Sequence, residues 1–341
     1  MSKPSSTDGA GQALAPRSAR TTGPGRVLDA PDRRDGRVYV ISREIDLAVK
    51  VALATGRPLL LRGEPGSGKS SLAAYIASKR RWRYYEHVVT SRTQARDLLW
   101  TFDSVRRLAD AEVRRSGLDL NDYDYVEPGV LWWAFARESA LRRGAPDGVT
   151  PTAHAVEQNA DINTARSADH AVVLVDEIDK ADPDMPNGLL VPLGSNEFIV
   201  SEINTVIRSA TRNQSVDAGI SKNIVVITTN EERTLPQAFL RRCVVVWLPQ
   251  PNKARLVAIA KAHMRTYEGG FSAADAALAR ALAAELDAVR DEARQQALRP
   301  PSTAEFLDAL RACRALDIPV GSEDWKNLRS LTLVKPQQPG Q

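Results

Sequence analysis

The segment from Gly63 to Ser70 has the residue types and spacing that bind the phosphates of a nucleotide. It reads GEPGSGKS and matches G-x-x-x-x-G-K-[ST] at every fixed position, with an apolar run before it and a helical stretch after it. Glycines let backbone N–H groups turn toward a phosphate, and the helix N-terminus adds partial positive charge. Lys69 is expected to reach the β- and γ-phosphates of ATP, and the Ser70 hydroxyl to ligate Mg²⁺. The alternative, a glycine turn that carries a lysine by chance, does not account for the complete motif in this context. The expected nucleotide-binding residues are Gly63, Glu64, Pro65, Gly66, Ser67, Gly68, Lys69, Ser70 and Ser71.

Two adjacent carboxylates follow the apolar run at 172–175. Asp176, at the strand tip, is expected to bind the nucleotide's Mg²⁺, and Glu177 to polarise the attacking water as a general base. Burying charge is costly, so two acids after a buried strand are poor structural material. The structural alternative is a helix cap, in which Asp176 or Asp179 bonds the following turn.

Two further polar sites follow later apolar runs. Asn230 ends the run that begins at Ile224, and its amide could orient the water beside the γ-phosphate, although a turn-forming asparagine is nearly as consistent with the sequence. Arg241 and Arg242 end a short helical stretch. An arginine supplied to a neighbouring subunit's nucleotide stabilises charge in the transition state. The alternative, an arginine that bonds the last helical carbonyls, suits Arg241 better than it suits both.

Five short apolar runs predict the strands that position these residues: 58–61, 87–89, 172–175, 224–227 and 244–248. Runs without in–out alternation are typical of strands covered on both faces of a parallel sheet. A helix is predicted at 41–55, and further helical stretches separate the strands at 70–80, 93–115, 130–143, 186–193 and 235–240. Strands that alternate with helices predict a three-layer α/β domain with a parallel five-stranded sheet.

Composition shifts predict the domain organisation. Residues 1–36 lack aromatic side chains and are rich in Pro, Gly, Ser and Thr, which favours a disordered tail, with a docking peptide as the alternative. The α/β domain is expected at 37–250. Helical patterns at 253–267, 273–296 and 304–316 follow two prolines and predict a small all-α domain at 251–334, with a tail at 335–341.

The α/β domain is longer than its sheet requires. An insert in the second helix is expected at about 91–143, where the segment 119–125 breaks the helical pattern, and a polar surface loop at 144–170. A hairpin is expected at about 196–208. Phe198 and Tyr123 are candidate substrate contacts, although aromatic residues in such places more often pack. The three tryptophans of this part, Trp100, Trp132 and Trp133, are expected in the core.

Charge and composition exclude several classes of protein. With 46 basic and 42 acidic residues the net charge is +4, and residues 1–37 carry seven basic against four acidic residues, or +3, so the remaining body is nearly neutral. A nucleic-acid footprint needs clustered charge on the folded part, so nucleic acid is not the expected partner. No apolar run approaches the length of a membrane span, and no apolar signal core is present. The two cysteines form no disulfide framework or metal cage, and we expect a cytoplasmic protein.

The motifs resemble those of a known family. Gly63–Ser70, Val172–Asp179, Asn230 and Leu235–Arg242 have the order and spacing of Walker A, Walker B, sensor 1 and the arginine finger of AAA+ ATPases. The amino-acid sequence is similar to that of the MoxR group over about residues 38–334. The segments that carry this narrower resemblance are Arg57–Gly66, Asp97–Asp103, Glu127–Ala134, Asp176–Ala181 and Pro186–Leu190.

The resemblance implies a hexameric ring with ATP between subunits, a finger at Arg242, and a ring pore faced by the insert and the hairpin. It implies ATP-driven remodelling or assembly of a client protein, often one with a von Willebrand factor A domain, in some cases in bacterial conflict systems. The family's second sensor is an arginine at the start of a helix of the small domain. The matching position lies near Ser302, so Arg299 is the arginine that could substitute. A nucleic-acid-acting ring ATPase and a nucleotide-dependent switch with little turnover remain alternatives.

Overall fold

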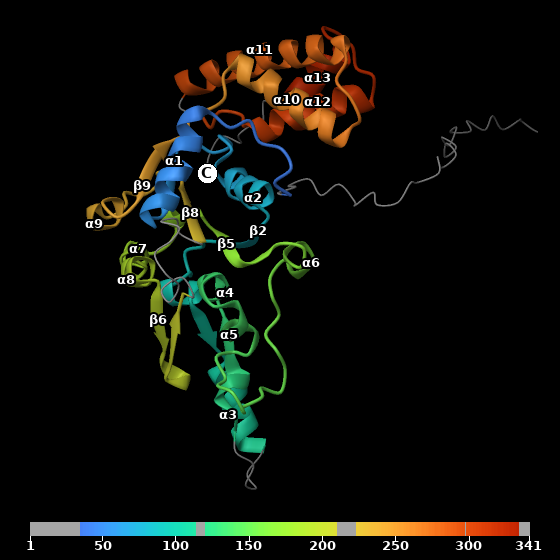
Figure 1. Ribbon diagram of the computed structural model, residues 1–341. Coiled ribbons are helices and arrows are strands. Elements are labelled where there is room, and N and C mark those ends of the chain that lie inside the picture. Colours follow the sequence, from blue (N-terminus) through green and yellow to red (C-terminus); the bar gives the residue numbers. More distant parts are fainter. Residues whose placement is uncertain (1–34, 114–119, 210–222, 297, 334–341) are drawn as a thin grey trace, which may run out of the picture. The chain divides into compact units, whose positions relative to one another are not determined.

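Figure 1 shows the computed structural model of the chain, which describes residues 35–113, 120–209, 223–296 and 298–333. The expected tail at 335–341, all but the last two residues of the expected tail at 1–36, and residue 119 of the 119–125 segment lie outside the described residues.

A five-stranded parallel sheet forms the centre of the α/β part, in the order β2-β5-β8-β1-β9. This confirms the predicted fold class, an α/β domain with a parallel sheet that is followed by helices. Two strands differ from the apolar runs, because β2 and β5 begin several residues before them. The strands are β1 (Leu59–Arg62), β2 (Trp82–Val88), β5 (Ser167–Asp176), β8 (Asn223–Thr229) and β9 (Val244–Trp247).

Helices cover both faces of the sheet, which is why its strands read as unbroken apolar runs. Leu59 and Leu61 of β1 face a largely aliphatic cluster with α1 (Arg43–Thr55) and α2 (Lys69–Arg80), whereas Leu60 faces an aromatic-rich cluster on the other side. α1 has both end signals, since the Ser42 side chain accepts from the N–H of Ile45 and Gly56 is left-handed at the C-cap.

The helix predicted at 93–115 is wrong over its first half. The segment instead forms a 3₁₀ turn, η1 (Ala95–Leu98), the strand β3 (Trp100–Phe102), and only then α3 (Ser104–Val113). β3 pairs antiparallel with β4 (Val126–Pro128), a partner distant in sequence that local periodicity cannot reveal. Trp100 therefore lies on a strand, buried as expected.

The region after β4 also departs from one long helix. The predicted stretch 130–143 forms α4 (Val130–Phe135) and α5 (Arg137–Leu141), separated at Ala136, and Trp132 and Trp133 of α4 are buried as expected. Tyr123 lies half-buried in the 3₁₀ turn η2 (Asp122–Tyr125).

The chain forms a hairpin where the sequence predicted one. β6 (Glu197–Val200) and β7 (Thr205–Arg208) pair antiparallel around the 3₁₀ turn η4 (Ser201–Ile203). Phe198 is buried, and its ring stacks on Trp100 at 5.7 Å between centroids and meets Trp132 edge-on at 6.0 Å. Phe198 is thus a packing residue that joins the hairpin to the insert.

The segment expected as a polar surface loop, 144–170, contains α6 (Ala160–Asn163) and the first residues of β5. Its amide side chains bond the free edge of β2. The N–H of Tyr84 donates to Asn163 Oδ1 at 2.8 Å and Asn163 Nδ2 donates to the Tyr84 carbonyl at 3.2 Å; Gln158 makes the same pair of bonds to Glu86. Side-chain amides thus take the place of a neighbouring strand.

The C-terminal helical region has its own core, which contains Leu256, Leu286, Phe306 and Trp325. Its helices are α10 (Lys253–Tyr267), α11 (Ala273–Gln295), α12 (Thr303–Ala315) and α13 (Glu323–Thr332). The remaining elements lie in the α/β part: η3 (Ile178–Lys180), α7 (Met185–Gly188), α8 (Leu190–Ser195) and α9 (Gln237–Leu240). Among the described residues, no helix is both long and apolar enough to span a membrane.

Candidate nucleotide site

The glycine-rich loop lies between β1 and α2, as the motif requires. Gly63 has φ +145°, and a Cβ there would lie 2.3 Å from the carbonyl oxygen of Leu248, so only glycine fits. Gly68, at φ +91°, is the N-cap of α2 and provides no side-chain cap. Because the N-cap has no side chain, it accepts none of the N–H groups of the first turn of α2, and these groups suit an acceptor from outside the helix.

Lys69 points back over this loop. Its Nζ donates to the carbonyl oxygens of Gly63 at 2.6 Å and Glu64 at 2.9 Å, and to Asn230 Oδ1 at 2.8 Å. The residue is 6% exposed. Burial lowers the pKa of the Lys69 ammonium from its usual value, and Asp176, Asp179 and Glu177 oppose that shift. The amine is held among acceptors beside the carboxylates.

Ser70 and Asp176 form the second contact of the site. Ser70 Oγ donates to Asp176 Oδ1 at 2.6 Å, which joins the start of α2 to the carboxyl end of β5. Thr228 Oγ1, from β8, donates to the same oxygen at 2.7 Å. Asp176 is 3% exposed. A hydroxyl and a carboxylate oxygen at this separation are the donor types that a hard cation such as Mg²⁺ prefers.

Glu177 follows in a left-handed conformation, at φ +60°. Its N–H donates to Thr228 Oγ1 at 2.8 Å. Its carboxylate accepts from Asn230 Nδ2 at 3.1 Å and pairs with Lys180 Nζ at 2.6 Å. Asn230 therefore bridges Lys69 and Glu177, one through each atom of its amide.

Two residues of this cluster received no role in the sequence analysis beyond a possible cap. The buried Asp179 accepts from the N–H of Asn230 at 3.1 Å and from that of Glu232 at 2.9 Å, which fixes the loop after β8. Thr228 links Asp176 to Glu177. The only sequence signal for either is its place at a strand end beside a candidate residue, which is weak without the fold.

The two arginines expected to act on the nucleotide lie outside this cluster. Arg242 is exposed after α9, where its Nη1 donates to the carbonyl of Ala238 at 3.3 Å. Arg299 is exposed as well. Ser302 instead meets the glycine-rich loop: a Cβ at Gly66 would lie 2.2 Å from Ser302 Cβ.

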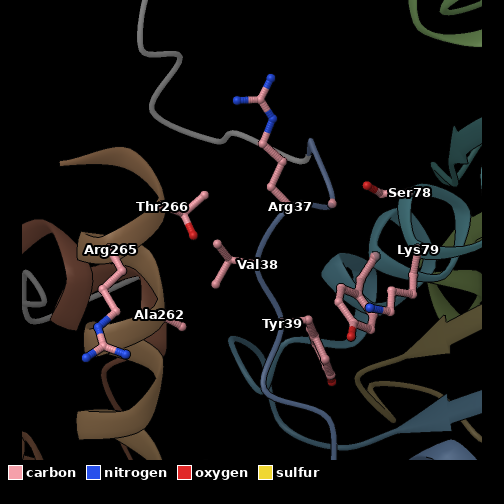
Figure 2. A pocket seen from close by; sticks show the side chains of 10 residues that line it. Arg37, Val38, Tyr39, Ser78, Lys79, Ala262, Arg265 and Thr266 are labelled. Atoms are coloured by element: carbon pink, nitrogen blue, oxygen red, sulfur yellow. The ribbon is translucent and has the colours of Figure 1, made fainter. Parts of the chain in front are cut away.

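A cavity of about 390 Å³ lies between the segment before α1, the second half of helix α2 and helix α10. Figure 2 shows this segment running between the two helices, with Val38 pointing toward Ala262 and Thr266 of α10. The Tyr39 ring also lies 3.5 Å from where a Cβ on Gly68 would be. Its hydroxyl is buried without a hydrogen-bond partner among the described residues, and burial raises the pKa of Tyr39 to about 12. Tyr39 thus joins the cavity to the glycine-rich loop.

Comparisons with known proteins give one family match from the sequence and several solved structures of similar fold. The family model described as AAA domain (dynein-related subfamily) matches residues 58–243, more than half of the chain. No curated protein sequence matches significantly.

Solved structures similar to this chain include two variants of RuvB from Thermotoga maritima, each 13% identical, with TM-scores of 0.42 and 0.41. Each match covers 85% of this chain, and 67% and 70% of the respective RuvB chain. An ATPase candidate from Cytophaga hutchinsonii is 15% identical with a TM-score of 0.40, over 88% of this chain and 83% of its own. On the family match, the chain belongs to the AAA domains of the dynein-related subfamily.

Proposed function

We propose that the chain binds Mg²⁺–ATP at the glycine-rich loop and hydrolyses it, with Glu177 as the general base. AAA domains generally bind and hydrolyse nucleotides. The observation that carries the proposal is one hydrogen-bonded series: Lys69 bonds Asn230, and Asn230 bonds Glu177. It links the group that would hold the γ-phosphate to the group that would activate the water.

The loop supplies the phosphate contacts. The first-turn N–H groups of α2 and the Lys69 ammonium would bind the phosphates, and the two carbonyls that accept from Nζ are neutral acceptors that phosphate oxygens can replace. Partial burial strengthens the attraction between Lys69 and a phosphate, because less water screens it.

Ser70 and Asp176 would hold Mg²⁺, which when bound neutralises charge on the β- and γ-phosphates. Among the described residues no group of three or more His, Cys, Asp or Glu side chains could hold a metal alone. A hydroxyl and one carboxylate suit Mg²⁺ that takes its other ligands from phosphate and water.

Glu177 would accept the proton of the attacking water. Asn230 and Lys180 fix the carboxylate from two sides, and the bond from its own N–H to Thr228 fixes the backbone. A base oriented in this way needs no rearrangement at the moment of proton transfer. The cavity lined by Tyr39 would take the base and ribose, since the Tyr39 ring also lies against Gly68 of the loop that would take the phosphates.

Substitution of the loop lysine tests the proposal. Wild-type protein is expected to bind a fluorescent Mg²⁺–ATP analogue and release phosphate. Lys69→Met should lose turnover by about 100-fold or more because it removes charge stabilisation at the transferred phosphoryl group. Lys50→Met, which changes an exposed lysine on α1, is the matched control that should behave as wild type. Absence of nucleotide binding by the wild type would contradict the proposal.

We further propose that Arg242 acts on a nucleotide bound by a neighbouring copy in a homo-oligomeric ring, as the hexamers of MoxR-like ATPases imply. Its side chain is exposed and donates to the Ala238 carbonyl of its own helix, which leaves it accessible to a neighbouring subunit. Glu177→Gln and Arg242→Ala should each be inactive alone, and mixing them should restore part of the activity, because some interfaces then pair an intact Glu177 with an intact Arg242. Activity of Arg242→Ala alone, or no recovery on mixing, would contradict this role.

We propose that turnover drives remodelling of a client protein, with a partner containing a von Willebrand factor A domain as the first candidate and a bacterial conflict system as one possible setting. Support comes from α3, which exposes an apolar stripe: Val105 is 79% and Val113 is 84% exposed, with Leu108 between them. Such a stripe is typical of a protein-binding surface. Protein retained by ATP-loaded Glu177→Gln should be lost when Val105 and Leu108 are changed to serine. Retention of nucleic acid and no protein would favour the nucleic-acid ATPase instead.

A further inference from the structure

Arg290, on α11, is a charged residue in the interior of the C-terminal helical region. It is 2% exposed. Its Nε donates to the carbonyl of Pro301 at 3.0 Å and its Nη1 to the carbonyl of Pro251 at 2.9 Å. Pro251 lies just before α10 and Pro301 just before Ser302, the N-cap of α12. One guanidinium therefore holds two segments of the chain, one just before α10 and one just before α12.

Burying the guanidinium of Arg290 costs more desolvation free energy than burying an apolar side chain in its place would. The hydrogen bonds of the guanidinium go to two neutral carbonyls, and Nη2 is buried with no partner among the described residues. Burial lowers the pKa of Arg290, an effect to which Arg294 adds and which Asp287, Glu64 and Glu305 oppose. An apolar side chain of similar volume would fill the space without this desolvation cost.

The turn that Arg290 fixes is the one that meets the glycine-rich loop. Gly66 has φ +76°, and a Cβ on it would lie 2.2 Å from Ser302 Cβ and 2.9 Å from Ser302 Cα. Glu64, two residues before Gly66, has a buried Oε2 without a partner among the described residues, and it is one of the carboxylates that favour the charged form of Arg290. The helical region and the loop thus meet at Ser302 and Gly66, with Arg290 directly behind Ser302.

We propose that Arg290 is a positioning residue for the nucleotide site: by holding Pro301 it sets Ser302 against Gly66, and so fixes the glycine-rich loop in its binding conformation. It acts through Pro301 and Ser302, in contrast to the exposed Arg299. This inference rests on the proposed function, since the loop must bind nucleotide for its position to matter. Because Glu177 and Asn230 are untouched, losing Arg290 weakens nucleotide affinity more than it slows the chemical step.

The first experiment is Arg290→Lys, measured for the dissociation constant of a fluorescent Mg²⁺–ATP analogue and for KM and kcat. Lysine keeps the charge, but its single nitrogen does not reproduce the planar fork that spans two carbonyls. We expect affinity to fall by about tenfold, with kcat at saturation within about twofold of wild type. Arg314→Lys is the matched control. Arg314, on α12, pairs with Glu268 and Asp275, so its change should lower the melting temperature without altering affinity.

The second experiment tests the route. Ser302→Gly removes the Cβ that contacts Gly66, while glycine remains an acceptable N-cap. If Arg290 acts through Ser302, the double variant should lose less affinity than the two single losses combined. Strictly additive losses, or an Arg290→Lys protein that melts earlier but binds as tightly as wild type, would overturn the inference. Failure of the proposed function is a different result, because the wild type itself would then not bind the analogue.

Discussion

Two polar networks lie against the same sheet, and they differ in which of their buried polar atoms lack a hydrogen-bond partner among the described residues. The site network consists of Lys69, Ser70, Asp176, Glu177 and Asn230 at the carboxyl ends of the strands. The edge network lies on the outer side of β2 and consists of Arg83, Tyr85, Arg137, Glu157 and Asn163. Tyr85 Oη donates to Glu157 Oε1 at 2.7 Å, and Arg137 Nη2 donates to Glu157 Oε2 at 2.6 Å.

Both networks bury charge, so buried charge alone does not mark a functional site. In the edge network the carboxylate is satisfied: both oxygens of Glu157 are bonded and Asn163 bonds both backbone groups of Tyr84, while the buried atom without a partner among the described residues is a donor, Arg83 Nε. Beside the site network, by contrast, Ser67 Oγ, Glu64 Oε2 and Asp179 Oδ1 are buried without partners among the described residues. Three orphaned oxygens beside glycines at positive φ support the proposal that the site network takes a ligand.

The largest expected effect is on the site network. Glu177→Gln keeps the shape of the side chain and removes the base, so turnover should fall by about 100- to 10,000-fold. The ion pair with Lys180 is partly exposed, and the melting temperature should shift by less than about 2 °C. Phosphate release and thermal unfolding measure the two. Asp169→Asn, at the exposed opposite end of β5, is the control and should change neither.

The edge network should respond in the opposite way. Glu157→Gln leaves Arg137 without its buried carboxylate partner, and the free energy of unfolding should fall by about 3 kcal/mol. Specific activity of the folded protein should remain near that of wild type. Glu138→Gln removes the other, exposed acid beside Arg137 and should cost less than about 0.5 kcal/mol in urea unfolding. If Glu157→Gln abolished turnover in folded protein, the comparison would fail.

The pH dependence of stability distinguishes Glu157 of the edge network from His263 of the helical region. Burial acts to raise the pKa of Glu157, but hydrogen bonds from Arg137 and Tyr85 outweigh it and hold that pKa below the usual value, so stability from this carboxylate is lost only below about pH 4.5. His263 shifts the dependence on pH to a higher range. Burial lowers its pKa to about 4; Arg311 adds to this shift and Asp35 opposes it. The unfolded state binds this proton from about pH 6.5 downward and the folded state does not, so stability falls as pH falls from 6.5 to 4.

At about pH 5 the His263 effect should amount to about 2 kcal/mol relative to pH 7. Urea unfolding at the two pH values measures it. His263→Gln should flatten the pH dependence in this window, while exposed His154→Gln should leave it unchanged. An unchanged slope in His263→Gln would mean that another group titrates.

The smallest expected effect is on the amide bonds to β2. Asn163→Ala removes the bonds that Asn163 makes to the N–H and carbonyl of Tyr84, leaves that carbonyl its 3.4 Å bond from Asn159 Nδ2, and should lower the free energy of unfolding by about 1–2 kcal/mol. Asp161→Ala, exposed on the same short helix α6, is the control. An equal loss in the two variants would show that α6 itself, rather than the amide bonds, stabilises β2.

Much of the fold could be predicted because the information is local. The apolar runs of β1, β8 and β9 and the helix signals of α1 predicted those elements closely. β2 was only partly predicted, since its first half contains Arg83, Tyr84 and Tyr85, whose polar groups are satisfied by residues of a distant loop. The helix predicted at 93–115 failed for a similar reason, because β3 depends on pairing with β4.

The candidate site divides in the same way. The motifs placed Lys69, Ser70, Asp176, Glu177 and Asn230 on loops and strand ends, and parallel strands bring their carboxyl ends to one edge, where the structure joins these side chains by hydrogen bonds. No comparable sequence signal marks Thr228, and none marks Arg290, since α11 has an ordinary helical pattern that carries two other arginines.

The sequence alone determined the glycine-rich loop, the acidic strand end and the alternation of strands with helices, because each depends on neighbouring residues and on backbone preferences. Only the tertiary structure decided that Phe198 packs inward, that Arg299 is exposed, and that Ser302 meets Gly66 with Arg290 behind it. These are contacts between segments far apart in the chain, and their energies depend on burial and on hydrogen-bond partners that exist only after the chain has folded.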